Sequence, residues 1–227
     1  MEIAQQVPDG PYLLRSGRLS KELGIYLILG FLEKAGDELF NSCAMFDPQG
    51  KLIAKYSKVH PATEAFITPG RELKPFDTPI GRIGFLICGD RNVPHNFATL
   101  AAQGAEIVFL PMDGGGNHPN TQLMQTRAWE NYCWIVQANT WSSLIVTPHG
   151  SLYHERYEKE CVSVQRLDLG ENPPRNNFKF RRPDLYGPLT AEYEKNSWYT
   201  PDGGISEQLK QERVRHLENL RKAQDKP

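Results

Sequence analysis

The segment that decides the fold reads IGFLICGDRNVP, at residues 83–94. Its apolar first half predicts a buried strand, and Gly89 and Pro94 predict a tight turn that leads into a helix. Cys88 therefore lies at the carboxyl end of a strand, where open α/β sheets place their ligand sites. Nearby helix amides would stabilise a thiolate there, as a nucleophile requires. The alternative is a buried structural cysteine, and position alone does not decide between the two.

Helices and strands alternate after this segment. We expect helices at residues 93–104 and 120–132, and strands at 105–111 and 134–139, a pattern typical of a parallel or mixed sheet covered by helices. Residues 144–147 and 161–167 are expected to pair across a turn at His149-Gly150.

The chain before this segment predicts a helix, a strand and a hairpin. A short helix at residues 12–23 can end at Gly24, and the apolar run at 24–32 predicts a buried strand. Residues 41–46 and 51–56 flank Asp-Pro-Gln-Gly, which indicates a hairpin turn. Cys43, Cys133 and Cys161 lie in apolar contexts and are expected in the core.

Length and composition narrow the class of protein. The 227 residues carry 39% hydrophobic and 23% charged residues with a net charge of -1, which favours one globular domain and gives no general attraction to nucleic acid or anionic lipid. The apolar runs are too short to span a membrane, so no membrane partner is expected. Four cysteines without a CxxC pair, and a start unlike a signal peptide, favour a cytoplasmic protein. His60, His95 and His118 match no metal-ligand spacing, so we expect no metal or cofactor.

A second segment, KYSKVHPATEAFITPG at residues 55–70, carries Lys58 and Glu64. A lysine aimed at a reacting carbonyl stabilises the developing oxyanion, and a neighbouring carboxylate holds the lysine in orientation. Such pairs are also common on protein surfaces, so this spacing alone indicates little.

Taken in order, these segments resemble the carbon–nitrogen hydrolase (nitrilase) superfamily over about residues 9–189. The motifs that carry the resemblance are DPQGK at 47–51, KYSKVH at 55–60, ICGDR at 87–91, GAEIV at 104–108, RAWEN at 127–131, QAN at 137–139, PHG at 148–150 and RRPDLY at 181–186.

The resemblance implies an αββα sandwich and hydrolysis of a non-peptide carbon–nitrogen bond in a small amide or N-carbamoyl substrate, without a metal. It assigns Cys88 as the nucleophile, Lys58 as the stabiliser of the tetrahedral intermediate and Glu64 as a second carboxylate. Subunits of the family commonly pack together, so a homo-oligomer is expected.

Three residues are candidates for substrate binding. Arg91 resembles an arginine that contacts the substrate carboxylate in the N-carbamoyl branch, although a structural ion pair is the alternative. Asp113 and Gly114 follow a strand at the same sheet edge as Cys88, where backbone amides can line a pocket.

The general base of the family, a glutamate in a Pro-Glu context, has no match here. Only nine residues precede Gly10-Pro11, so we expect the first β-α-β elements to be missing from a domain at residues 1–189. Residues 190–227 predict a charged helical tail, either solvated or docked on a partner subunit; its only apolar stripe is Leu209, Val214, Leu217 and Leu220. Two hypotheses remain: a thiol hydrolase, or a non-catalytic scaffold for assembly or ligand binding.

Overall fold

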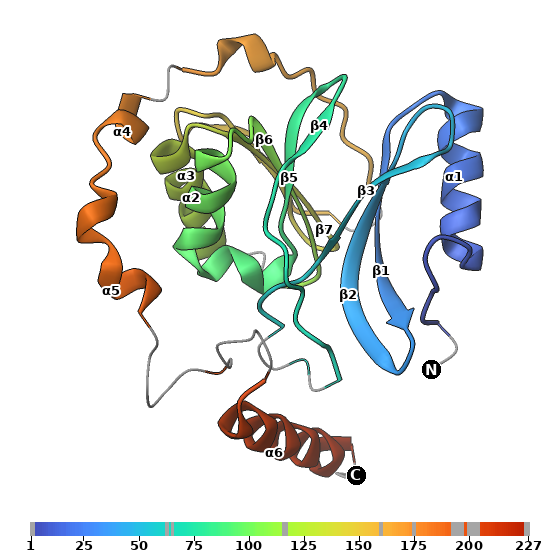
Figure 1. Ribbon diagram of the computed structural model, residues 1–227. Helices are drawn as coiled ribbons and strands as arrows, with labels where there is room; N and C mark the ends of the chain where they lie inside the picture. Colours follow the sequence, from blue (N-terminus) through green and yellow to red (C-terminus); the bar gives the residue numbers. More distant parts are fainter. Residues whose placement is uncertain are drawn as a thin grey trace.

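The computed structural model describes residues 3–61, 64, 66–114, 118–158, 161–173, 176–191, 198 and 205–224. Two β-sheets lie face to face, with one helix outside the first sheet and two helices outside the second (Figure 1). This helix–sheet–sheet–helix order is the αββα sandwich predicted from the sequence.

The first sheet is an antiparallel meander in the order β1-β2-β3. Its strands are β1 (Leu27–Ala35), β2 (Glu38–Phe46) and β3 (Leu52–Ser57). The hairpin between β2 and β3 confirms the turn predicted at residues 47–50. The strand expected at residues 24–32 begins later, at Leu27, and is only half-buried, because Gly24 adopts a left-handed φ of 64° and closes the preceding helix.

That helix, α1 (Pro11–Leu23), covers the outer face of the first sheet (Figure 1). Leu13 is fully buried and packs with Ala44 and Phe46 of β2. Residues before α1 add one parallel bridge, between Gln5 and Glu33 of β1.

The second sheet has the strand order β4-β5-β6-β7-β8-β9. Its strands are β4 (Phe76–Thr78), β5 (Gly81–Phe85), β6 (Ile107–Met112), β7 (Trp134–Asn139), β8 (Ser143–Val146) and β9 (Leu152–Arg156). Strands β5, β6 and β7 are parallel, and the outer pairs are antiparallel. The helices α2 (Pro94–Ala102) and α3 (His118–Asn131) cover its outer face (Figure 1).

The main core lies between the two sheets. Cys43 and Tyr56 from the first sheet belong to the same buried cluster as Phe85 and Val108 from the second. Burial raises the pKa of the Cys43 thiol, so this cysteine stays protonated.

Two sequence predictions about the later part of the chain are wrong. Strand β8 pairs with β9, not with residues 161–167, because the turn closed by Thr147 N–H and the Ser151 carbonyl (2.9 Å) reverses the chain at once. Residues 161–168 have no regular secondary structure, and Cys161 is half-buried rather than part of the core.

The remaining chain forms short helical turns and one long helix. These elements are η2 (Leu169–Glu171), α4 (Asn176–Lys179), η3 (Pro183–Leu185), α5 (Gly187–Thr190) and α6 (Glu207–Gln224). In α6, Leu209 is buried, Leu217 is half-buried and Val214 is 55% exposed, and the side chain of Leu220 lies outside the described residues. The domain division at residue 189 stays a prediction. Among the described residues, no helix combines the length and apolarity needed to cross a membrane.

We predict that Leu13→Ala lowers the free energy of unfolding by about 2–5 kcal/mol, because it leaves a cavity beneath α1. Leu14→Ala is the matched control, since Leu14 is 48% exposed, and should change stability by less than about 0.5 kcal/mol. Urea unfolding measures both; equal losses for the two variants would contradict the packing of α1.

Candidate active site

Cys88 begins the short helix η1 (Cys88–Asn92), directly after β5 and the buried residues that follow it. Its φ of 46° lies in the left-handed region, which non-glycine residues seldom adopt. The thiol is half-buried; Sγ lies 3.7 Å from the Asp113 carbonyl oxygen and 3.7 Å from Nη1 of Arg91, which donates to it. The strained turn therefore presents the sulfur at the carboxyl end of the sheet, beside a cation.

Lys58 follows β3 and is only 4% exposed. Its Nζ forms an ion pair with Oε1 of Glu64, and Oε2 of Glu64 accepts a hydrogen bond of 3.0 Å from Nδ2 of Asn41. A Cβ atom built on Gly89 would lie 3.8 Å from Lys58 Nζ, so the ammonium lies against the turn that carries Cys88. The structure thus brings together the three residues that sequence analysis names as catalytic candidates.

The Asp90 carboxylate is fully buried and holds this arrangement in place. Its Oδ2 accepts from the Tyr56 hydroxyl (2.7 Å) and the Ile87 N–H (3.0 Å), and its Oδ1 accepts from the His60 N–H (3.0 Å). In the sequence, Asp90 stands out only as part of the ICGDR motif, and this supporting role was missed. The signal was available in principle, because an acid directly after a buried strand requires partners.

The buried surroundings of Tyr56 shift the pKa of its hydroxyl. Burial, and then the neighbouring Asp90 carboxylate, raise the pKa of the Tyr56 hydroxyl well above its usual value. The phenol therefore remains a hydrogen-bond donor to Asp90 across the neutral range.

Arg91 lies beside Cys88, and helix α3 supports its backbone. The Arg91 carbonyl accepts a hydrogen bond of 3.5 Å from Nε of Arg127 in α3, and Arg127 pairs with Glu130 at 2.9 Å. Glu130 thus neutralises the arginine that supports this turn. Among the described residues, Arg91 forms no ion pair, but its Nη1 contacts Cys88 Sγ.

Asp113 and Gly114 lie near the site but contribute differently from the prediction. The sequence predicts that backbone N–H groups line the pocket, but the contacts are made by backbone carbonyl oxygens. The Asp113 carbonyl faces Cys88 Sγ, and the Gly114 carbonyl accepts a hydrogen bond of 3.3 Å from Nδ2 of Asn139. Residues 115–117 of the same loop lie outside the described residues.

The three histidines named from the sequence do not form a cluster. His60 Nδ1 contacts Nδ2 of Asn96 at 3.1 Å, His95 is exposed, and the His118 side chain lies outside the described residues. Within the described part of the chain, no three metal-binding side chains form a group. Of the early carboxylates, Glu2 is not described and Asp9 is exposed just before α1.

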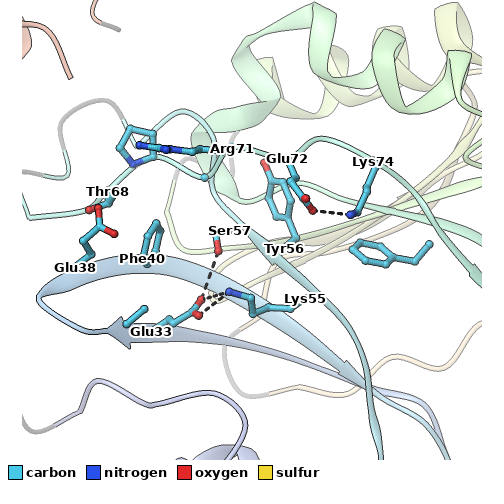
Figure 2. Close-up of a pocket in the computed structure, with 14 residues that line it drawn as sticks. Glu33, Glu38, Phe40, Lys55, Tyr56, Ser57, Thr68, Arg71, Glu72 and Lys74 are labelled. Carbon is cyan, nitrogen blue, oxygen red and sulfur yellow. Dashed lines mark hydrogen bonds and ion pairs between the residues drawn. The ribbon is translucent and has the colours of Figure 1, made fainter. Parts of the chain in front are cut away.

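A cavity of about 440 Å³ lies beside β3, and its lining does not include Cys88, Lys58 or Glu64 (Figure 2). The buried Glu33 carboxylate accepts from Lys55 Nζ at 2.6 and 2.8 Å and from Ser42 Oγ at 2.6 Å. These groups satisfy one another, so we interpret the cluster as structural.

We predict that Tyr56→Phe lowers the free energy of unfolding by roughly 1.5–3 kcal/mol, because it removes a buried hydrogen bond to a carboxylate. Since folding raises the Tyr56 pKa, the stabilisation is complete below the usual value of 10.0 and is lost as pH rises toward the folded value. Wild type should therefore lose more stability above pH 10 than the variant. Tyr12→Phe, at a residue 51% exposed, is the control; equal pH slopes for wild type and Tyr56→Phe would contradict the assignment.

Comparison with known proteins agrees with this geometry. Residues 1–171 match the family described as Carbon-nitrogen hydrolase. The chain is 30% identical to deaminated glutathione amidase of Rattus norvegicus, covering 80% of this chain but 66% of the rat protein. It is 28% identical to N-carbamoylputrescine amidase of Solanum lycopersicum, over 81% of this chain and 74% of the other. A carbon-nitrogen hydrolase from Helicobacter pylori G27 shares the fold, with a TM-score of 0.69, 21% identity and coverage of 78% and 75% of the two chains. The chain therefore belongs to the carbon-nitrogen hydrolase family.

Proposed function

We propose that this protein hydrolyses the carbon–nitrogen bond of a small amide or N-carbamoyl compound through the thiol of Cys88. The observation that carries the proposal is the buried Lys58 ammonium, held by Glu64 against the turn that presents Cys88. The amidase and N-carbamoyl amidase names of the relatives support the same class of substrate.

In the first step, Cys88 Sγ attacks the substrate carbonyl carbon, and a C–S bond forms as the carbonyl π electrons move to oxygen. Lys58 Nζ stabilises the resulting oxyanion. Because the ammonium is buried and already oriented by Glu64, it need not reorganise as the charge develops.

In the second step, the C–N bond breaks and the leaving nitrogen takes a proton. The thiol proton is the one that reaches this nitrogen, and Glu64, the carboxylate that contacts Lys58, keeps the ammonium oriented toward the oxyanion. Water then attacks the thioester, the C–S bond breaks, one proton of the water goes to the sulfur, and the acid leaves with the thiol restored.

Arg91, Asp113 and Gly114 provide the substrate contacts in this proposal. The Arg91 guanidinium, 3.7 Å from Cys88 Sγ, suits a substrate that carries a carboxylate close to its reacting carbonyl. The carbonyl oxygens of Asp113 and Gly114 suit the N–H groups of an amide or carbamoyl nitrogen.

Assembly and location are part of the proposal. Exposed Trp129 (58%) and Trp141 (52%) are large apolar surfaces that a second subunit would cover, which supports a homo-oligomer. The composition supports a cytoplasmic location.

We expect Cys88→Ala to abolish turnover of an amide and N-carbamoyl panel, and Lys58→Met to lower kcat about 10²–10³-fold through loss of oxyanion stabilisation. Cys161→Ala is the matched control, because Cys161 is half-buried and lies outside the site, and it should keep wild-type activity. A folded wild-type chain without turnover would favour the non-catalytic scaffold, and turnover by Cys88→Ala would overturn the thiol mechanism.

Arg91→Ala tests the choice of substrate. It should raise KM about tenfold or more for N-carbamoyl or amide substrates that carry a carboxylate, because it removes a charge-assisted hydrogen bond worth about 1.5–3 kcal/mol. Neutral amides of similar size are the comparison. An equal rise in KM for both classes would contradict the assignment of Arg91 as the carboxylate contact.

A further inference from the structure

The C-terminal helix α6 buries an arginine against the rest of the chain. Most of its described side chains are exposed, but Leu209 is 1% and Arg213 5% exposed. These positions are one helical turn apart and lie on one face. Ser206 Oγ accepts from the Leu209 N–H at 3.2 Å and caps the start of the helix just before this face.

The partner of Arg213 lies in the loop that carries Glu64. Nη1 of Arg213 donates a hydrogen bond of 3.1 Å to the Ile67 carbonyl oxygen. The Ile67 N–H in turn donates to the Glu64 carbonyl at 3.1 Å, so the two residues close a turn. A cation 146 positions away in the sequence therefore holds one end of the turn whose other end carries the Glu64 carboxylate.

The loop is also fixed at its far end. The Thr68 N–H donates to the Leu39 carbonyl at 2.7 Å, and the Gly70 N–H donates to the Lys58 carbonyl at 2.8 Å. The hydrogen bond from Arg213 of α6 to the Ile67 carbonyl restrains the backbone near Glu64 over a long range in sequence. Since the Glu64 side chain meets the buried Lys58 ammonium, a small displacement of the turn separates the two charges.

We propose that Arg213 is a positioning residue: through the Ile67 carbonyl, α6 holds Glu64 on Lys58. This rests on the proposed function for its kinetic consequence, because Lys58 and Glu64 act in the reaction itself. The tail helix is then part of the catalytic unit and not a solvated appendage.

The test compares Arg213→Met with Arg213→Lys and with Arg215→Met as a matched control. Arg215 lies on the same helix, is exposed and pairs with Glu212 at 3.0 Å. We expect Arg213→Met to lower kcat about 10–100-fold with little change in KM, as misplacement of a catalytic group does. Arg213→Lys should recover most of the activity, and Arg215→Met should match wild type.

A double-variant cycle separates positioning from general destabilisation. If Arg213 acts through Glu64, adding Arg213→Met to Glu64→Gln should lower kcat no further than Glu64→Gln alone. Additive losses, or wild-type kcat in Arg213→Met, would overturn the proposal.

A readout without turnover keeps this test distinct from that of the proposed function. The rate of Cys88 carbamidomethylation by iodoacetamide at neutral pH, followed on the Cys88 peptide by mass spectrometry, should rise in Glu64→Gln, because the Lys58 charge is then uncompensated beside the thiol. It should rise equally in Arg213→Met and no further in the double variant. An unchanged rate in Arg213→Met would overturn the positioning role even if the chain shows no turnover.

Discussion

The buried Asp90 carboxylate is the interaction on which the candidate site depends. It joins the two sheets of the sandwich, because Tyr56 lies in β3 and His60 shortly after it, whereas Ile87 and Asp90 follow β5. A fully buried carboxylate is costly unless it is hydrogen-bonded, and three donors bond to this one. The ends of the two strands are therefore held together by an electrostatic requirement as well as by the apolar core.

The catalytic candidates are neighbours of these donors. Lys58 lies between Tyr56 and His60, and Cys88 lies between Ile87 and Asp90. Once Asp90 has its partners, the lysine and the cysteine must meet at the same sheet edge, and Glu64 completes the arrangement by neutralising Lys58. Arg127 of α3 adds the third support by holding the backbone of Arg91.

Much of the fold could be predicted from the sequence. The helix ending at Gly24, the hairpin at residues 47–50 and the parallel strands after Cys88 all follow from local turn chemistry and apolar periodicity. The pairing of β8 with β9 could not, because strand partners depend on where the chain reverses, and the segment at residues 161–167, with its alternating apolar residues, looked equally suitable.

The sequence could name the residues of the candidate site, but it could not show which contacts hold them in place. Cys88, Lys58 and Glu64 stand out by position and by resemblance to a family. The role of Asp90, the carbonyl contacts of Asp113 and Gly114, and the burial of Arg213 arise only when distant segments pack. A charged helix with few apolar residues gives no sign that one of its arginines is buried.

The most direct measurement of the central claim is mass spectrometry of the acid-quenched protein after brief incubation with an amide substrate. The account predicts an acyl adduct on the peptide that contains Cys88, at lower occupancy in Lys58→Met, with Cys43, Cys133 and Cys161 unmodified. An adduct confined to another residue, or turnover without any adduct under conditions that trap thioesters, would contradict it.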